Sequence, residues 1–284
     1  MKVFSTKKEL QKEMEQIRKE GKTVGFVPTM GALHEGHLSL INRSVAENDV
    51  TAVSIFVNPT QFNNRSDLEK YPRDLQRDLL LLEKNGCDIV FSPSVDEMYD
   101  KNEFESVFEF DFGGLDQVME GKFRPGHFNG VVQVVSKLFN LVQPTKAYFG
   151  EKDFQQLAII RRMVNLMNFD IEIVGCPIVR EKDGLAMSSR NLRLNAEERQ
   201  KAVEISKTLF ESKKLISNFS PEQVQNWVIA RLNSFSGLEV EYFEIVHETT
   251  LQPIHSWSEP AIGCIAVFCG EVRLIDNIKY NDVQ

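Results

Sequence analysis

VPTMGALHEGH, residues 27–37, follows directly on a strand pattern at Thr23–Val27 and precedes a helical pattern over residues 38–45. A strand, a glycine-containing turn and a helix in this order are typical of an open α/β sheet, in which ligands bind beyond the carboxyl ends of the strands. Gly31 suits a tight turn, because glycine adopts backbone conformations that other residues avoid. We therefore expect this segment to lie at a ligand site of an α/β domain.

The rest of the first half alternates apolar strand patterns with amphipathic helix patterns. Further strands are expected at Val50–Val57, Ile89–Phe91, Ala147–Phe149 and Ile171–Val174. Continuous apolar strands separated by helices predict a Rossmann-like parallel sheet with helices on both faces. The valines of segment 131–142 favour a strand, but its length and spacing favour a helix, which is what we predict.

The pattern changes after about Arg180. Asn195 and Glu198 form a plausible helix cap, and two helical segments follow. Strands are then expected at 240–246, 262–268 and 272–278 without helices between them. The chain is thus predicted to form a Rossmann-like domain over residues 1–178 and a smaller C-terminal α+β domain over residues 179–284.

Composition excludes several classes of protein. The 284 residues are 42% hydrophobic and 26% charged, as in soluble globular proteins. The 33 basic and 41 acidic residues give a net charge of −8, which argues against wholesale nucleic-acid binding but permits a locally positive site for a small anion. No signal-peptide pattern and no membrane-length apolar run occurs. The four cysteines lack a CxxC pair and are expected to be buried thiols of a cytoplasmic protein.

Two histidines three residues apart open the helix after the turn. His34 and His37 would share one face of the first helical turn, at the end that attracts phosphate groups. An imidazole there can donate a hydrogen bond to an oxygen that gains charge. The alternative is that both histidines only cap the turn, because short motifs match by chance. The strand–turn–helix setting favours a ligand site.

A second polar segment, SIFVNPTQF (residues 54–62), follows the second predicted strand. The amides of Asn58 and Gln61 can bind hydroxyl and carboxylate groups without adding charge. An Asx-type turn before Pro59 explains Asn58 equally well, and Gln61 less well.

Two further segments carry charge suited to a nucleotide. In FGEKDFQQ (residues 149–156), Lys152 can neutralise phosphate and Asp153 can hold a metal-bound nucleotide, although a solvated helix start has the same pattern. In AMSSR (residues 186–190), hydroxyls beside Arg190 can bind a triphosphate. An exposed linker is the alternative for AMSSR.

These segments resemble those of a known family in chain order. The turn resembles the HIGH signature of nucleotidyl-transferring Rossmann proteins, and AMSSR stands where they have a KMSKS loop, though without its lysines. With YPRD, RPGHFNGV and RLIDNI added, the chain resembles the pantothenate synthetase (pantoate–β-alanine ligase) family over essentially its whole length.

The resemblance implies that pantoate attacks the α-phosphate of MgATP to form pantoyl adenylate, and that β-alanine then forms the amide of pantothenate and releases AMP. It implies His34, His37 and Lys152 as catalytic residues, with His37 moving a proton or only stabilising charge. Gln61 and Gln156 would bind pantoate, and Gln61 would also bind β-alanine. The implied ATP-binding residues are Met30, Gly31, Ala32, Leu33, His34, Glu35, Gly36, His37, Gly150, Glu151, Lys152, Asp153, Val179, Met187, Ser188, Ser189 and Arg190.

The resemblance also implies partners and domain roles. Mg²⁺ would enter with ATP, with Asp153 as a candidate contact and no direct metal motif. The expected partners are the three small substrates, without nucleic acid or membrane, in a homodimer whose C-terminal domain acts as a partial lid. Arg124 and His127 would lie either at the active-site rim or in structural roles.

Three other functions compete with this one. A nucleotidyltransferase that stops at the nucleotidyl product shares the turn but does not need the NPTQF and EKDFQQ amides. An RNA-binding synthetase-like module is disfavoured by the charge of −8. A purely binding or structural protein has no reason to place four polar segments at successive strand ends.

Overall fold

The computed structural model describes residues 1–100, 103 and 108–280, and the chain divides into two compact units. The first unit comprises residues 1–113, 124–151 and 156–177, and the second comprises 114–123, 152–155 and 178–284. The main division, between Pro177 and Ile178, lies one residue from the expected boundary. Two short segments, 114–123 and 152–155, belong to the second unit although they precede that boundary.

Long-range polar contacts explain why the two short segments belong to the second unit. Glu120 accepts hydrogen bonds from Arg273, with the closest N–O distance 2.6 Å, and from the Tyr242 hydroxyl at 2.9 Å. The Asn277 amide donates to the main-chain carbonyl of Lys152 at 3.0 Å. Because these partners lie more than 100 residues apart in the chain, no local pattern could reveal the contacts.

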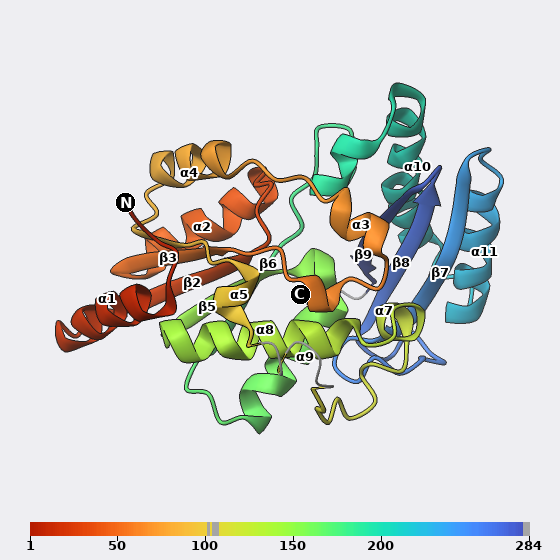
Figure 1. The fold of residues 1–284 in the computed structure, drawn as a ribbon. Coiled ribbons are helices and arrows are strands. Elements are labelled where there is room, and N and C mark those ends of the chain that lie inside the picture. Colours follow the sequence, from red (N-terminus) through yellow and green to blue (C-terminus); the bar gives the residue numbers. More distant parts are fainter. Residues whose placement is uncertain (101–102, 104–107, 281–284) are drawn as a thin grey trace. The chain divides into compact units, whose positions relative to one another are not determined.

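The first unit is built on a six-stranded sheet in which every pairing of the described strands is parallel (Figure 1). The strand order is β1-β4-β3-β2-β5-β6. The strands are β1 (Lys2–Phe4), β2 (Val24–Thr29), β3 (Val50–Ile55), β4 (Ile89–Phe91), β5 (Lys146–Gly150) and β6 (Glu172–Cys176). Sequence analysis missed only β1 among these, because a three-residue strand with two exposed positions has no measurable periodicity.

Helices cover both faces of this sheet, as predicted. The first unit contains α1 (Lys7–Lys19), α2 (Glu35–Glu47), α3 (Arg65–Glu69), α4 (Leu75–Lys84), α5 (Val95–Met98), α8 (His127–Val142) and most of α9 (Phe154–Leu166), with a short 3-10 turn at Pro59–Gln61. A second 3-10 turn, Glu151–Asp153, begins in the first unit and ends in the second. Ile41 of α2 and Leu82 of α4 share one buried cluster with Val27 of β2. On the opposite face, the Phe139 ring of α8 meets the Phe26 ring of β2 edge-on at 6.3 Å. The ambiguous segment 131–142 is therefore a helix.

The signature segment, residues 27–37, lies where the strand order reverses. Strand β2 pairs with β3 on one side and with β5 on the other. The chain therefore adds β3 and β4 on one side of β2, and β5 and β6 on the opposite side. Such switch points form crevices outside the carboxyl ends of the strands in open α/β sheets. The turn therefore follows the carboxyl end of a central parallel strand.

The second unit is a smaller α+β structure, also as predicted. An antiparallel sheet in the order β7-β8-β9 consists of β7 (Leu238–His247), β8 (Ala261–Cys269) and β9 (Val272–Lys279). Its helices are α7 (Met119–Phe123), α10 (Ala196–Ser212) and α11 (Pro221–Asn233), with 3-10 turns at Ser189–Arg193 and Lys213–Leu215. The predicted capping box of Asn195 and Glu198 begins α10.

The structure shows the state of the cysteines and the character of the helices. All four cysteines are buried free thiols, and burial raises the pKa of Cys87 to about 12. None of the helices in the described ranges is both long enough and apolar enough to cross a membrane.

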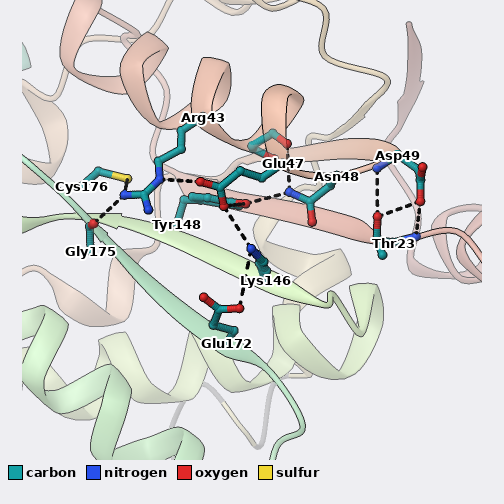
Figure 2. A network of polar contacts seen from close by, with 11 residues as sticks. Thr23, Arg43, Glu47, Asn48, Asp49, Lys146, Tyr148, Glu172, Gly175 and Cys176 are labelled. Atoms are coloured by element: carbon teal, nitrogen blue, oxygen red, sulfur yellow. Dashed lines mark hydrogen bonds and ion pairs between the residues drawn. The ribbon is translucent and has the colours of Figure 1, made fainter.

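An ion-pair network ties the last turn of α2 to strands β5 and β6 (Figure 2). The Glu47 carboxylate accepts from Arg43 at 2.9 Å, from Lys146 at 3.1 Å and from the Tyr148 hydroxyl at 3.0 Å. Arg43 also donates to the carbonyl of Gly175 at 3.0 Å. Hydrogen bonds from Arg43, and next from Lys146, lower the pKa of Glu47 from 4.5 to about 2, with burial acting in the opposite direction.

This network predicts an acid-sensitive contribution to stability. Because the pKa of Glu47 is lower in the folded chain, its contribution is complete above pH 4.5 and is lost as the pH falls towards 2. We expect Glu47→Gln to lower the free energy of unfolding by up to about 1 kcal/mol at pH 7. In urea titrations the difference from wild type should narrow between pH 4.5 and 2. Glu69→Gln, which removes a more exposed ion pair, should lower the free energy of unfolding at pH 7 by less than Glu47→Gln does. A pH-independent difference for Glu47→Gln would contradict the assignment.

Candidate functional site

The signature segment forms a tight turn whose backbone is held by side chains. Gly31 and Ala32 have φ values of 78° and 50°, the left-handed region that favours glycine. Thr29 Oγ1 accepts from the Gly31 N–H at 3.1 Å and donates to the Ser54 carbonyl at 2.7 Å. The ends of strands β2 and β3 thereby fix where the turn begins.

Asp78 of α4 holds the middle of the turn. Its two carboxylate oxygens accept from the backbone N–H groups of Ala32 and Leu33, each at 2.8 Å, and the residue is 1% exposed. Burial raises the pKa of Asp78, and the two backbone hydrogen bonds act against that shift. A side chain at position 31 would place its Cβ 2.9 Å from Asp78 Oδ2, so both space and backbone conformation require Gly31.

Sequence reasoning missed Asp78, although one signal was present. The buried residues of α4 are Asp78 and Leu82. Asp78 stands four residues before Leu82, on the same helical face. A carboxylate in a buried stripe points to a specific backbone or charge partner.

His34 and His37 both hold the start of α2. His34 is the N-cap residue, and its Nδ1 accepts from the Gly36 N–H at 3.1 Å. His37 Nδ1 accepts from the His34 N–H at 3.4 Å, and the two ring centroids lie 4.1 Å apart. The capping role considered for these residues is therefore real. It also fixes their chemistry, because a neutral ring whose Nδ1 accepts carries its proton on Nε2.

The second polar segment lies against the signature turn within the first unit. Gln61 Nε2 donates to the sulfur of Met30 at 3.1 Å, and Asn58 Nδ2 donates to Gln61 Oε1 at 3.3 Å. Asn58 is 1% exposed, and its Oδ1 accepts from the Tyr99 hydroxyl at 2.8 Å. The turn explanation of Asn58 holds, since its side chain also accepts from the Thr60 N–H.

Arg124 and His127 position the backbone of Gln61. His127 Nδ1 lies 2.8 Å from the Gln61 carbonyl, and Arg124 donates to the same oxygen at 3.3 Å. Helix α8 also approaches the backbone of the preceding residue closely, because a Cβ at Gly130 would lie 2.5 Å from the carbonyl atoms of Thr60. These contacts give both residues the structural role that was one of their two alternatives.

The chain passes from the first unit to the second between Glu151 and Lys152. Gly150 ends β5 and Glu151 opens a 3-10 turn. Lys152 is 17% exposed at its side chain, and its ammonium lies 3.3 Å from the Asp153 carboxylate. Gln156 is half-buried on α9. The neighbouring Gln155 is structural, because it donates to main-chain carbonyls of the segment 114–123.

The AMSSR segment follows an ordered hairpin rather than an unstructured linker. The Met187 N–H donates to the Val179 carbonyl at 3.0 Å, and a bridge joins Arg180 to Ala186. Ser188 then caps a 3-10 turn, its Oγ accepting from the Arg190 N–H at 3.2 Å. Ser189 is 7% exposed. The segment is therefore held in one conformation within the second unit.

No group of three or more His, Cys, Asp or Glu residues within the described ranges could hold a metal ion. Asp153, at 46% side-chain exposure, is the predicted contact for Mg²⁺, and one carboxylate is what a phosphate-bound Mg²⁺ ordinarily needs from a protein.

Comparisons with known proteins all point to one family. A family model described as pantoate-beta-alanine ligase matches residues 2–279. The pantothenate synthetase of Bacteroides thetaiotaomicron is 59% identical, with 100% of each chain covered, and that of Phocaeicola vulgatus is 60% identical, with 99% of each covered. A crystal structure of pantothenate synthetase from Thermus thermophilus matches with a TM-score of 0.92 at 43% identity, over 99% of each chain. A pantoate-beta-alanine ligase from Francisella tularensis, complexed with beta-gamma ATP and beta-alanine, matches with a TM-score of 0.83 at 35% identity, over 99% of this chain and 98% of that one.

Proposed function

Because this chain belongs to the pantoate–β-alanine ligase family, we propose that its signature turn and its segments 150–153 and 187–190 serve the ATP-dependent condensation of (R)-pantoate with β-alanine. The enzyme is a ligase that forms an amide bond. The products are pantothenate, AMP and diphosphate, and the intermediate is pantoyl adenylate. Adenylation is needed because a free carboxylate has no good leaving group for attack by an amine.

One observation supports the roles in the first unit above all others. Two imidazoles at the start of α2 accept at Nδ1, so each presents a proton on Nε2 in its neutral form. A helix N-terminus favours phosphate, and Nε2–H donors there stabilise the charge that develops on the α-phosphate. A hydrogen bond donated by the Nε2–H of a neutral His37 would stabilise the charge on the α-phosphate without transfer of the proton. Met30–His37 would line the ATP site.

The amides of the first unit are suited to the organic substrates. Gln61 is 9% exposed, and its main-chain carbonyl is contacted by His127 and Arg124. These contacts fix the backbone from which the Gln61 side chain extends. We assign Gln61 and Gln156 to the hydroxyl and carboxylate groups of pantoate, and Gln61 also to β-alanine. Gly150 and Glu151 would contact ATP through the end of β5.

The second unit would supply positive charge and hydroxyl groups to ATP. Lys152 would bridge its phosphates, Met187–Arg190 would contact the triphosphate, and Val179 would meet the adenine through its backbone. Mg²⁺ would be bound chiefly by the phosphates, with Asp153 as its protein contact, and would neutralise phosphate charge.

We also propose a cytoplasmic homodimer. Four buried free thiols are typical of proteins that stay in a reducing compartment. Light scattering on the purified protein would give its oligomeric state, and a monomeric mass would contradict the dimer.

A component-omission assay tests the function. With pantoate, β-alanine, ATP and Mg²⁺ present, AMP and pantothenate should form in equal amounts. Pantoate-dependent ATP–pyrophosphate exchange should proceed without β-alanine, because adenylation is the first step. A retained nucleotidyl product would indicate a nucleotidyltransferase instead, and AMP release driven by β-alanine without pantoate would refute the order of steps.

A further inference from the structure

Two consecutive residues of strand β9, Asp276 and Asn277, are buried and polar. They are 4% and 5% exposed, in a strand that otherwise contributes Val272, Leu274 and Ile278 to the core of the second unit. Buried polar side chains need specific partners to offset the loss of water. The partner of Asn277 is Lys152, to which the proposed function assigns an ATP contact. The partner of Asp276 is Arg180, which lies in the hairpin between Val179 and the Met187–Arg190 segment.

Asp276 holds the hairpin that precedes Met187–Arg190. Its carboxylate accepts two hydrogen bonds from the Arg180 guanidinium, at 2.7 and 2.9 Å, in the bidentate geometry that fixes orientation as well as distance. Arg180 also donates to the Gly184 carbonyl at 3.1 Å, across the hairpin tip. Its guanidinium lies 5.1 Å from the ring centroid of Phe210 on α10. The start of the hairpin is therefore fixed from two sides.

Asn277 holds the backbone of Lys152. Its Nδ2 donates to the Lys152 carbonyl at 3.0 Å, although the two residues are 125 positions apart. Successive side chains of a strand point in opposite directions, so two neighbouring residues of one strand can serve two separate segments. The main-chain N–H of Asn277 donates to Asp276 Oδ1 at 2.8 Å, which links the Asp276 carboxylate to the backbone of Asn277.

We propose that Asp276 and Asn277 are positioning residues that set Lys152 and the Met187–Arg190 segment in a common arrangement, with Asn277 acting through the Lys152 carbonyl. The proposal rests on the proposed function, in which both segments contact ATP. Fixing a residue's main chain limits where its ammonium group can lie, and a displacement of about 1 Å can cost about 10²-fold in rate.

A double-mutant cycle tests whether Asn277 acts through Lys152. We expect Asn277→Ala to lower pantoate-dependent ATP–pyrophosphate exchange by about 10- to 10²-fold in the wild-type background. In a Lys152→Ala background the same change should have little further effect, because residues acting through one another are not additive. Equal fold-losses in both backgrounds, or unchanged exchange in Asn277→Ala, would overturn the proposal.

A matched control separates positioning from stability. Tyr280 follows β9 directly, is 3% exposed, and its hydroxyl lies 2.8 Å from Ser212 Oγ. Both Tyr280→Phe and Asn277→Ala should lower the melting temperature, because each removes a buried hydrogen bond. Only Asn277→Ala should lower exchange, and an equal loss of exchange in Tyr280→Phe would assign the effect to stability and overturn the proposal. If Asn277→Ala does not fold, Asn277→Gln enters the same cycle, since it keeps the amide but displaces it by one methylene.

Failure of the function and failure of this inference give different results. Wild-type protein without pantoate-dependent exchange would refute the proposed function. Unchanged exchange in Lys152→Ala would refute the role given to Lys152. Normal wild-type exchange, a loss in Lys152→Ala and additive effects of Asn277→Ala would refute the positioning role alone.

Discussion

Lys152→Ala is expected to lower pantoate-dependent ATP–pyrophosphate exchange by about 10²–10³-fold, the usual cost of removing one group that stabilises developing charge. The side chain is largely buried at 17% exposure, and its ammonium lies 3.3 Å from the Asp153 carboxylate. A charge that is partly shielded from water interacts more strongly with phosphate than an exposed one does. The loss should appear in the adenylation step, before β-alanine enters.

Lys201→Ala is the matched control for this prediction. Lys201 is also paired with a carboxylate, Glu197, at 2.7 Å, and it lies in the same unit on α10. Its removal should leave exchange at the wild-type rate. Both variants should melt within a few degrees of wild type, because ion pairs with an exposed partner contribute little to stability. Wild-type exchange in Lys152→Ala would contradict the role of this residue in adenylation.

The second large effect concerns His34 and His37, whose capping and catalytic roles can be separated. Asn is among the best N-cap residues, so His34→Asn should keep the cap while removing the Nε2–H donor. Gln at the third helical position completes a capping box, so His37→Gln should keep the reciprocal bond. We expect each variant to stay folded, with stability changed by about 1 kcal/mol or less, and to lose about 10²–10³-fold in exchange.

A third histidine provides the control for these variants. His247 Nδ1 accepts from the Thr249 N–H at 3.1 Å, the same kind of backbone contact, in the second unit. His247→Asn should therefore keep full exchange activity. If His34→Asn and His37→Gln also keep it, the two histidines serve only as caps, and the phosphate role fails.

Sequence patterns predicted most elements of both units because their signals are local. The helix over 127–142, whose core segment was ambiguous, followed from its length, and the α10 cap followed from Asn195 and Glu198. The missed strand β1 pairs with β4, 87 positions later, and is too short to show a period. Its position at the sheet edge depends on a partner that no local pattern specifies.

In the candidate site, too, residues with a local sequence signal could be predicted and residues that depend on distant partners could not. His34, His37, Gln61 and Lys152 stand in recognisable segments at strand ends, so their chemistry was visible in the sequence. The role of Asp78 was not visible in the sequence, because this side chain accepts hydrogen bonds from two backbone N–H groups that lie 46 and 45 residues away. Arg124 and His127 were visible but left open between two roles, and only the tertiary structure shows that both contact the Gln61 carbonyl.

The sequence by itself determined the fold class, the strand–turn–helix at residues 27–37 and the family, because these depend on periodicity, caps and short segments in chain order. The tertiary structure decided which residues hold those segments in place. Asp78, Asn277 and the segment around Glu120 find their partners 45 to 153 positions away. The physical reason is that a buried hydrogen bond depends on distance in space, and packing brings such partners together without leaving a local signal in the chain.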